Sequence, residues 1–147
     1  MAVVTSKLDA TMLALADGLA LRAGLSGVQI ATGPLGGDSA QESIQLFTGS
    51  LDQEFVTTNR RREELLTIEG AIWVMRAGKD DTVIRVARAR AIALLAEIET
   101  FLRDDPSIGA TVRAAEVQAV SLDQGVNPDG RWCQLDFTLA ASQRLNT

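Results

Sequence analysis

Apolar residues recur at intervals of three and four in two stretches of the chain, which is the pattern of a helix with one buried face. The first stretch predicts a helix over residues 7–23. Ser6, with Asp9 three residues later, is typical of a capping box at a helix start, and Gly24 is typical of the left-handed residue at a helix end. The predicted apolar face consists of Leu8, Met12, Leu15, Ala16 and Leu19.

The second stretch predicts a longer helix over residues 82–103, with Asp81 as its N-cap and Pro106 shortly after its end. Arg85 and Arg88 fall near the side of this helix that faces solvent. The predicted buried stripe consists of Val83, Val86, Ala87, Ala91, Leu94, Ile98, Phe101 and Leu102.

Alternation of apolar and polar residues predicts strands elsewhere. A short strand over residues 28–31 leads into a turn-rich stretch, residues 32–38, which should be an exposed, mobile loop. The next strand covers residues 42–48 and is expected to end at Gly49 and Ser50, while residues 52–58 fit either a continued strand or a loop.

The clearest strand covers residues 64–75, where Gly70 predicts a bulge or a close approach by another backbone. Its two sides carry Leu66, Ile68, Ile72 and Val74 on one, and Thr67, Glu69, Ala71 and Trp73 on the other. Residues 112–122 and 131–139 then predict a β-hairpin around the turn-rich residues 123–130.

The element order is therefore α-β-β-β-α-β-β, which a chain of 147 residues accommodates in one domain spanning residues 1–147. We expect an α/β (α+β) fold in which about five strands form an antiparallel or mixed sheet with both helices packed on one face. The other face of the sheet is then left for solvent or for a partner.

The amino-acid composition excludes several classes of catalytic and metal-binding site. With 46% hydrophobic and 22% charged residues, the chain has an ordinary globular composition. The lack of histidine excludes serine–histidine and cysteine–histidine catalysis and, with a single cysteine, the usual structural zinc sites and any intramolecular disulfide. Cys133 lies in a predicted strand and is expected to be a small buried hydrophobe. No run approaches eighteen apolar residues, so we expect a cytoplasmic-type compartment and no membrane partner.

Three groups of residues remain as candidates for chemistry. The glycine-rich residues 33–37 follow a strand but lack the Gly-Lys-Ser/Thr run of a phosphate loop. Paired carboxylates at positions 63–64, 80–81 and 104–105 leave a divalent-metal site open. Arg60, Arg61 and Arg62 form the one basic cluster, and Glu63 and Glu64 follow them at once. In a chain of net charge −5, a solvated hairpin tip or a contact between subunits fits this cluster better than nucleic acid.

Several segments resemble the tail terminator proteins of long-tailed bacteriophages. Residues 61–74, with their basic-acidic start and alternating aliphatic residues, look like a strand of that family. Residues 102–109 are similar to the family's helix end, commonly an Asp-Pro-x-Leu-Gly run, with Ile108 where leucine is more usual. The Asp-x-Gly turn at residues 123–125 and the closing strand with residues 141–145 also fit, so the resemblance spans nearly the whole chain.

The resemblance implies a structural, non-enzymatic protein with no cofactor and no catalytic or metal-binding residues. Tail terminators form a hexameric ring on the finished tail tube, halt its polymerisation and present a surface to the head-side connector or stopper protein, while double-stranded DNA passes through the ring. The implied location is the head-proximal end of the tail in the virion, after assembly in the host cytoplasm.

Candidate contacts with neighbouring subunits or with the pore are Arg60, Arg61, Arg62, Arg85 and Arg88. Two alternatives stay open: a head-completion or neck adaptor protein, and a small metal-dependent or nucleotide-acting enzyme.

Overall fold

A computed structural model of the protein describes residues 6–33, 41–55 and 62–145. Its elements follow the predicted order α-β-β-β-α-β-β, with one additional 3₁₀ turn. The helices are α1 (Leu8–Ala20) and α2 (Asp81–Asp104), and the 3₁₀ turn η1 covers Ala23–Leu25. The strands are β1 (Gln29–Ala31), β2 (Glu42–Phe55), β3 (Arg62–Arg76), β4 (Ala114–Asn127) and β5 (Gly130–Leu145).

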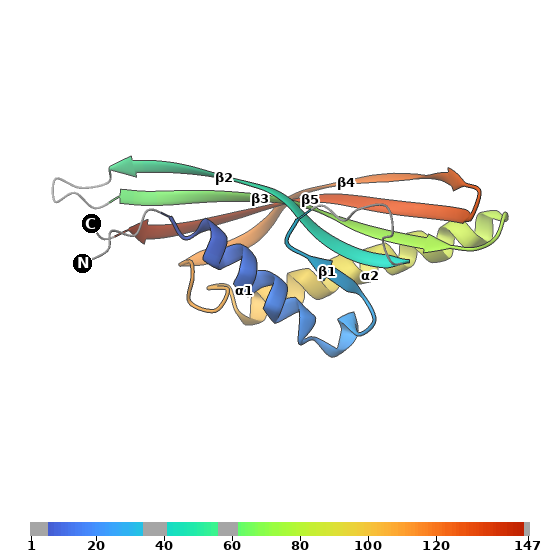
Figure 1. Ribbon diagram of the computed structural model, residues 1–147, viewed down its shortest axis with the longest axis horizontal. Coiled ribbons are helices and arrows are strands. Elements are labelled where there is room, and N and C mark those ends of the chain that lie inside the picture. The colour runs from blue at the N-terminus through green and yellow to red at the C-terminus, as the bar shows by residue number, and fades with distance from the viewer. Residues whose placement is uncertain (1–5, 34–40, 56–61, 146–147) are drawn as a thin grey trace.

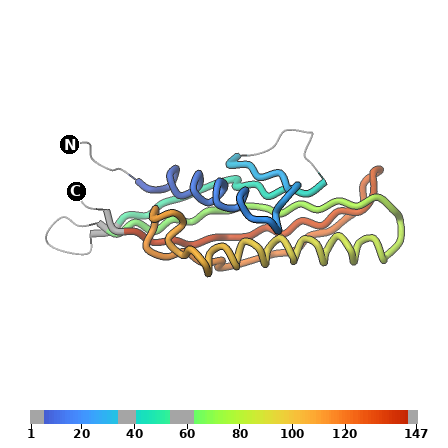
Figure 2. The backbone as a smooth tube through the Cα atoms, turned by 90° about the horizontal axis from the view of Figure 1, so that it is seen from below, coloured from blue at the N-terminus to red at the C-terminus, as the bar shows by residue number. Residues whose placement is uncertain are grey.

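The strands form one five-stranded sheet in the order β1-β2-β3-β5-β4. β1 runs parallel to β2, whereas every other neighbouring pair is antiparallel, so the sheet is mixed. Both helices lie on the same face of the sheet, α1 beside β1 and β2 and α2 along β3 and β5 (Figures 1 and 2). This confirms the predicted fold class. In the described part of the chain, no helix covers the opposite face.

The hydrophobic core fills the space between the helices and the covered face of the sheet. Leu15 and Leu19 of α1 and Leu94 and Ile98 of α2 are completely buried in it. Burying an aliphatic side chain of this size contributes about 1.5–3 kcal/mol. The side chains of β3 that were predicted to share one side all belong to this core: Leu66, Ile68, Ile72 and Val74.

Gly70 lies where a side chain of β5 and the backbone of β2 leave no room for a Cβ atom. The pairing of β2 with β3 shifts by one residue between Leu46 and Thr48, next to Gly70. A Cβ atom on Gly70 would lie 2.5 Å from the Phe137 ring of β5 and 2.6 Å from the backbone oxygen of Gln45. The predicted close approach is confirmed, and the bulge itself lies in β2.

The second strand is longer than predicted. β2 does not end at Gly49 and Ser50 but runs on to Phe55, because its pairing with β3 continues there. Gly49 lies inside β2 and leaves room for α1, since a Cβ atom at that position would lie 2.7 Å from the Leu8 side chain.

The C-terminal hairpin is also longer than predicted, and its turn is shorter. β4 runs to Asn127, so residues 123–125 lie inside a strand and form no Asp-x-Gly turn. Gly125 is instead the position over which the Trp132 ring packs, with 2.6 Å between its ideal Cβ and the ring. The hairpin prediction is confirmed, with only residues 128–129 at its tip and β5 extended to Leu145.

The ends of α1 differ from the prediction. The helix begins at Leu8, with Lys7 in the cap position. Ser6 Oγ accepts a hydrogen bond of 3.0 Å from the Leu8 N–H, but no side chain of the cap residue itself completes a capping box. Gly24 is part of η1, and the nearby glycine with left-handed backbone is Gly27, at φ 81°.

The start and the buried face of α2 also differ. Asp80 occupies the cap position without a side-chain hydrogen bond, and Asp81 pairs with Arg85 one turn later, at 2.8 Å between Oδ2 and Nε. Val86 was predicted to be buried but is 51% exposed, whereas Leu95 is buried. The sheet therefore covers a face centred on the buried residues Ala87, Ala91, Leu94, Leu95, Ile98 and Leu102.

Candidate interaction surfaces

Metal-ligating side chains do not cluster among the described residues. No three Cys, Asp or Glu side chains among them come together in a way that could hold a metal ion. Cys133 is completely buried, as predicted, and burial raises the pKa of its thiol. No helix in these ranges is both long and apolar enough to cross a membrane.

The paired carboxylates do not converge on shared ligands. Glu63 and Glu64, adjacent on β3, point to opposite faces of the sheet: Glu63 pairs with Arg113 at 3.0 Å, and Glu64 is buried. Asp105 accepts hydrogen bonds from the Gly109 N–H at 2.8 Å and from Ser107 Oγ at 2.7 Å. These two bonds, the one from Gly109 first, lower the pKa of the Asp105 carboxyl. Asp105 therefore shapes the loop after α2.

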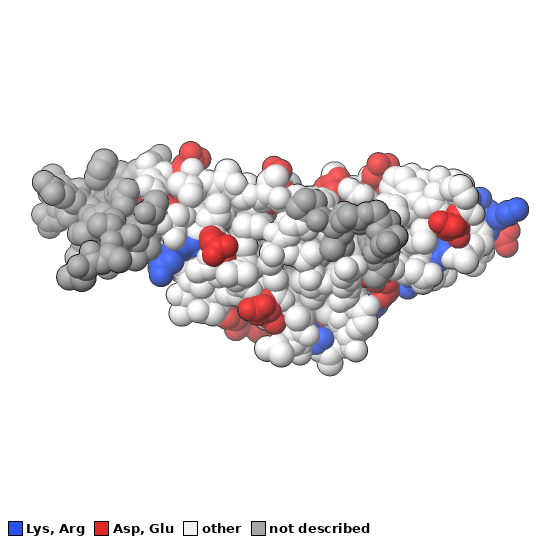
Figure 3. All heavy atoms as spheres, in the orientation of Figure 1, with Lys and Arg blue, Asp and Glu red and all other residues white. Residues whose placement is uncertain are grey.

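The uncovered face of the sheet is acidic. Its only ion pair among the described residues joins Arg113 to Glu63, near one end of the sheet. Figure 3 shows acidic groups spaced along the top of the molecule, above the strands. Such a surface repels phosphates and attracts basic partners. The carboxylates on this face without an ion-pair partner in the described chain are Asp52, Glu69, Glu116, Asp123 and Asp136.

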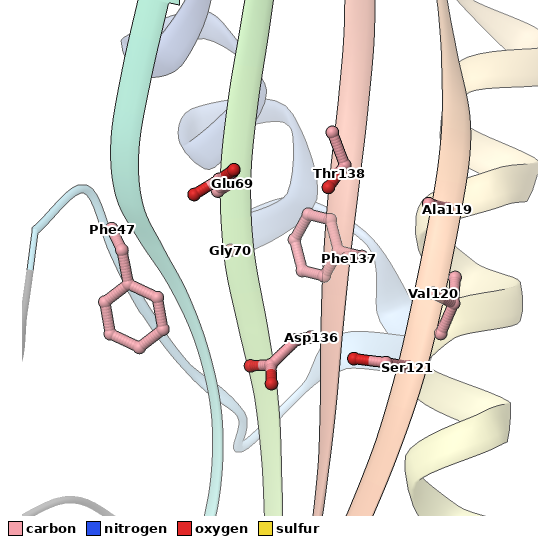
Figure 4. Close-up of a pocket in the computed structure, with 9 residues that line it drawn as sticks. All are labelled: Phe47, Glu69, Gly70, Ala119, Val120, Ser121, Asp136, Phe137 and Thr138. Atoms are coloured by element: carbon pink, nitrogen blue, oxygen red, sulfur yellow. The ribbon is translucent and has the colours of Figure 1, made fainter.

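The same face is shallowly hollowed where its side chains are small. One hollow of about 320 Å³ has Gly70 and Phe137 at its centre, with Phe47 on one side and Ser121 on the other (Figure 4). Glu69 and Asp136 supply its charge. A second hollow, of about 430 Å³, is lined by Leu65, Thr67, Ala114, Glu116, Ala140 and Ser142. These open hollows suit contact with another macromolecule better than enclosure of a small molecule.

Two tryptophans stack on this face toward one end of the sheet. The rings of Trp73 on β3 and Trp132 on β5 are 5.1 Å apart between centroids, with an interplanar angle of 20°. Both side chains are partly exposed. They are the one stacked pair of aromatic rings among the described residues.

The predicted arginine contacts fall in different places. Arg85 is exposed on α2 and pairs within its own helix with Asp81. Arg88 is only partly exposed, and its Nη1 donates to Gln124 Oε1 of β4 at 3.1 Å, so it lies at the junction of α2 and β4. Arg60, Arg61 and the side chain of Arg62 lie outside the described residues.

The structure also assembles an ionic cluster that sequence reasoning missed. Glu42 of β2 accepts hydrogen bonds from Arg90 of α2 at 2.8 Å and from Arg76 of β3 at 2.6 Å. The bond from Arg90, followed by that from Arg76, lowers the pKa of the Glu42 carboxyl, although partial burial opposes the shift. Arg90 and Arg76 are 48 and 34 positions from Glu42 in the sequence, so no local motif could predict the cluster. It fastens α2 to the sheet.

The domain belongs to the two-layer class in which two helices cover one face of a five-stranded mixed sheet. The same fold occurs in the solved structure described as "Virion of native gene transfer agent (GTA) particle". A chain of that virion matches 89% of this chain over 92% of its own length, with a TM-score of 0.56 and 13% sequence identity. No protein-family model and no curated protein matches the sequence.

Proposed function

We propose that this protein is a structural, non-enzymatic component of a phage-type virion, a ring that caps the tail tube, stops its polymerisation and joins it to the head-side connector. The observation that carries the proposal is the fold, which matches a virion chain over nearly the full length of both proteins. The sequence resemblance to tail terminators supplies the position in the particle and the hexameric state.

The distribution of charge supports assembly from copies of one chain. Arg85 and Arg88 lie on α2, while carboxylates without an ion-pair partner in the described chain, such as Asp52, lie on other elements. Unlike surfaces on one subunit favour head-to-tail contacts, which close into a ring when the rotation allows. Arg60, Arg61 and Arg62 are proposed as further contacts with neighbouring subunits or the pore.

The charge also suits the passage of double-stranded DNA. Each chain carries a net charge of −5, and the uncovered face of its sheet bears unpaired carboxylates. A protein grips DNA by neutralising phosphates with basic groups, and this surface supplies few of them. DNA should therefore move through the proposed ring without being held.

The proposal is tested by polymerising tail-tube subunits from the same particle with and without this protein. We expect added protein to shorten the tubes, make their lengths uniform and add a ring of density at one end in electron micrographs. A core variant, Ile98→Asp, serves as an inactive control, because Ile98 is completely buried.

Tubes of unchanged length with bare ends would contradict a terminator role. Binding to the head-side connector without any effect on tubes would indicate a head-completion or neck adaptor instead.

A further inference from the structure

Three exposed carboxylates form a diagonal line across the uncovered face of the sheet, and we call Glu69, Asp136 and Asp123 the carboxylate row. Glu69 of β3 pairs with Thr138 of β5, and Asp136 lies two residues from Thr138 on the same strand. Asp136 in turn pairs with Ser121 of β4, two residues from Asp123. Each step therefore crosses one strand and advances by two residues, which is about 8 Å.

Hydrogen bonds orient the carboxylate row but do not neutralise it. Glu69 Oε2 accepts a bond of 3.1 Å from Thr48 Oγ1, and Asp136 Oδ1 accepts one of 2.8 Å from Gln134 Nε2. Both donors are uncharged. None of the three carboxylates has an ion-pair partner among the described residues. The row is therefore a site of uncompensated negative charge, which attracts basic groups of a partner.

The surroundings of the row leave room for arginine side chains. The open hollow of about 320 Å³ is bordered by both Glu69 and Asp136 (Figure 4). At the other end of the row, Trp132 pairs with the residue two positions beyond Asp123, and it stacks on Trp73. A guanidinium group binds a carboxylate through paired hydrogen bonds and also stacks on aromatic rings. The row with its two tryptophans offers both kinds of contact.

The chain itself contains a segment of matching charge. Arg60, Arg61 and Arg62, the arginine cluster, are the only run of adjacent basic residues in the sequence. The two acidic residues that follow do not compensate the cluster, because Glu63 already has an ion-pair partner and Glu64 is buried on the helix side of the sheet. Three positive charges thus match the three negative charges of the row.

The arginine cluster cannot reach the carboxylate row of its own chain. Arg62 is the first residue of β3 and pairs with Phe55, the last residue of β2, so it lies at one end of the sheet. Arg60 and Arg61 are within two residues of Arg62, and their Cα atoms therefore lie within about 7 Å of it. Glu69 is seven residues further along β3 (62 to 69), about 23 Å away. The rest of the row is more distant still, so a second copy must supply the arginines.

We infer that the carboxylate row of one copy binds the arginine cluster of the next copy. The contact joins unlike surfaces, the end of one sheet and the face of another, so it is head-to-tail and continues around a ring. This inference rests on the proposed ring and names the contact that joins its subunits. A two-fold contact between two uncovered faces would bring like charges together, which electrostatic repulsion opposes. The same repulsion keeps the phosphates of DNA away from the row.

Two charge-reversed variants of the full chain test the contact. One variant replaces the arginine cluster with glutamate: Arg60→Glu, Arg61→Glu and Arg62→Glu. The other replaces the carboxylate row with lysine: Glu69→Lys, Asp123→Lys and Asp136→Lys. Each change should raise the protein concentration for half-assembly by about tenfold or more, because three ion pairs per interface become repulsive. Light scattering measures assembly, and circular dichroism verifies that each variant is folded.

An equal mixture of the two variants should assemble again. In the mixture the glutamate cluster of one variant meets the lysine row of the other, and the original arginines of the second variant meet the original carboxylates of the first. A control variant makes the same change of net charge on the two helices: Asp9→Lys, Asp17→Lys and Glu99→Lys. It should assemble like the parent, and it should not restore assembly when mixed with the glutamate-cluster variant.

Tryptophan emission gives a second readout of the same contact. Trp73 and Trp132 adjoin the row, so ring formation by the parent protein should lower the access of acrylamide to them. The equal mixture should reproduce this protection. Either variant alone should keep the access of the free subunit.

Three outcomes would overturn the inference. Folded variants that stay apart when mixed, while the parent forms rings, would mean that the subunits join elsewhere, and the proposed function would survive. Normal rings from the glutamate-cluster variant would show that the cluster is only solvated and would leave the row to a basic segment of another protein. A strictly monomeric parent, even with tail-tube subunits present, would remove both the contact and the ring.

Discussion

The Glu64 carboxylate, completely buried on the helix side of β3, accepts a hydrogen bond of 2.8 Å from the backbone N–H of Lys7 at the start of α1. Its other oxygen accepts a bond of 3.1 Å from Gln53 Nε2 of β2. The first backbone donors of a helix have no partner within the helix. A sheet residue 57 positions away supplies one here, and it thereby fastens the start of α1 to the sheet.

We predict that Glu64→Ala destabilises the protein by about 1–3 kcal/mol, because it leaves the partly buried Lys7 N–H without its acceptor. Glu64→Gln keeps an acceptor and should cost less. Glu63→Ala, at the partly exposed neighbouring position on the other face of the sheet, should change the free energy of unfolding by about 0.5 kcal/mol or less. Urea denaturation of the three variants measures the series. Equal losses for Glu64→Ala and Glu63→Ala would show that the buried bond contributes nothing.

The Glu42 cluster predicts a loss of stability in acid. The hydrogen bonds from Arg90 and Arg76 lower the pKa of Glu42 below its usual value of 4.5. The contribution of the carboxylate is therefore fully present above that value and is lost as the pH falls through the lower, folded-state pKa. Glu42→Gln should be less stable than the parent by about 1–2 kcal/mol at pH 7.

The difference between Glu42→Gln and the parent should shrink as the pH falls through the lowered, folded-state pKa of Glu42, because the parent carboxyl then becomes protonated. Thermal melts of both proteins from pH 7 downward provide the measurement. A difference that stays constant over the whole pH range in which both proteins fold would show that the Glu42 charge does not act through its two arginines.

The tight approach at Gly70 predicts that Gly70→Ala is costly. The new methyl group would collide with the Phe137 ring and with the backbone oxygen of Gln45, so we expect a loss of about 1–3 kcal/mol. Gly33→Ala is the control, because no atom lies within 4 Å of its ideal Cβ position. Denaturant midpoints compare the two, and partial recovery in Gly70→Ala with Phe137→Leu would identify the ring as the main obstacle.

Burial of Cys133 predicts that its thiol reacts only when the protein opens. The raised pKa keeps the thiol protonated near neutral pH, and the protonated form is a poor nucleophile. A chromogenic disulfide reagent should therefore label the native protein slowly, at a rate that rises with denaturant in step with global unfolding. Rapid labelling of protein that is fully folded by circular dichroism would contradict this.

Much of the fold could be predicted from the sequence, because the buried residues of the main helices and strands recur at regular spacings. The alternation from Leu66 to Val74 and the helical spacing from Leu94 to Leu102 each describe one buried face, and both were predicted. The errors in the bounds of the strands concern glycines. Gly49 and Gly125 have the local character of chain breakers, but each lies within a paired strand and makes room for a side chain from another element. Only the tertiary structure distinguishes a glycine that ends a strand from one that makes room for a neighbouring side chain.

The interaction surfaces were less predictable for a similar reason. The sequence indicated an open sheet face and exposed arginines on the second helix, but it gave no strand order. The carboxylate row depends on β5 lying between β3 and β4, since that order places Asp136 between Glu69 and Asp123. The Glu42 cluster and the Glu64 bond likewise join residues that are far apart in the chain. No short-range spacing encodes them.

The stacked Trp73 and Trp132 give the molecule a built-in optical label for one surface. The chain has two tryptophans and no tyrosine, so its near-ultraviolet emission originates almost entirely from this pair on the uncovered sheet face. A partner that covers the face will change the emission maximum and the access of a soluble quencher such as acrylamide. A partner that binds at the β2 or β4 edge will leave both nearly unchanged. Unmodified protein can therefore report spectroscopically which side an added component occupies.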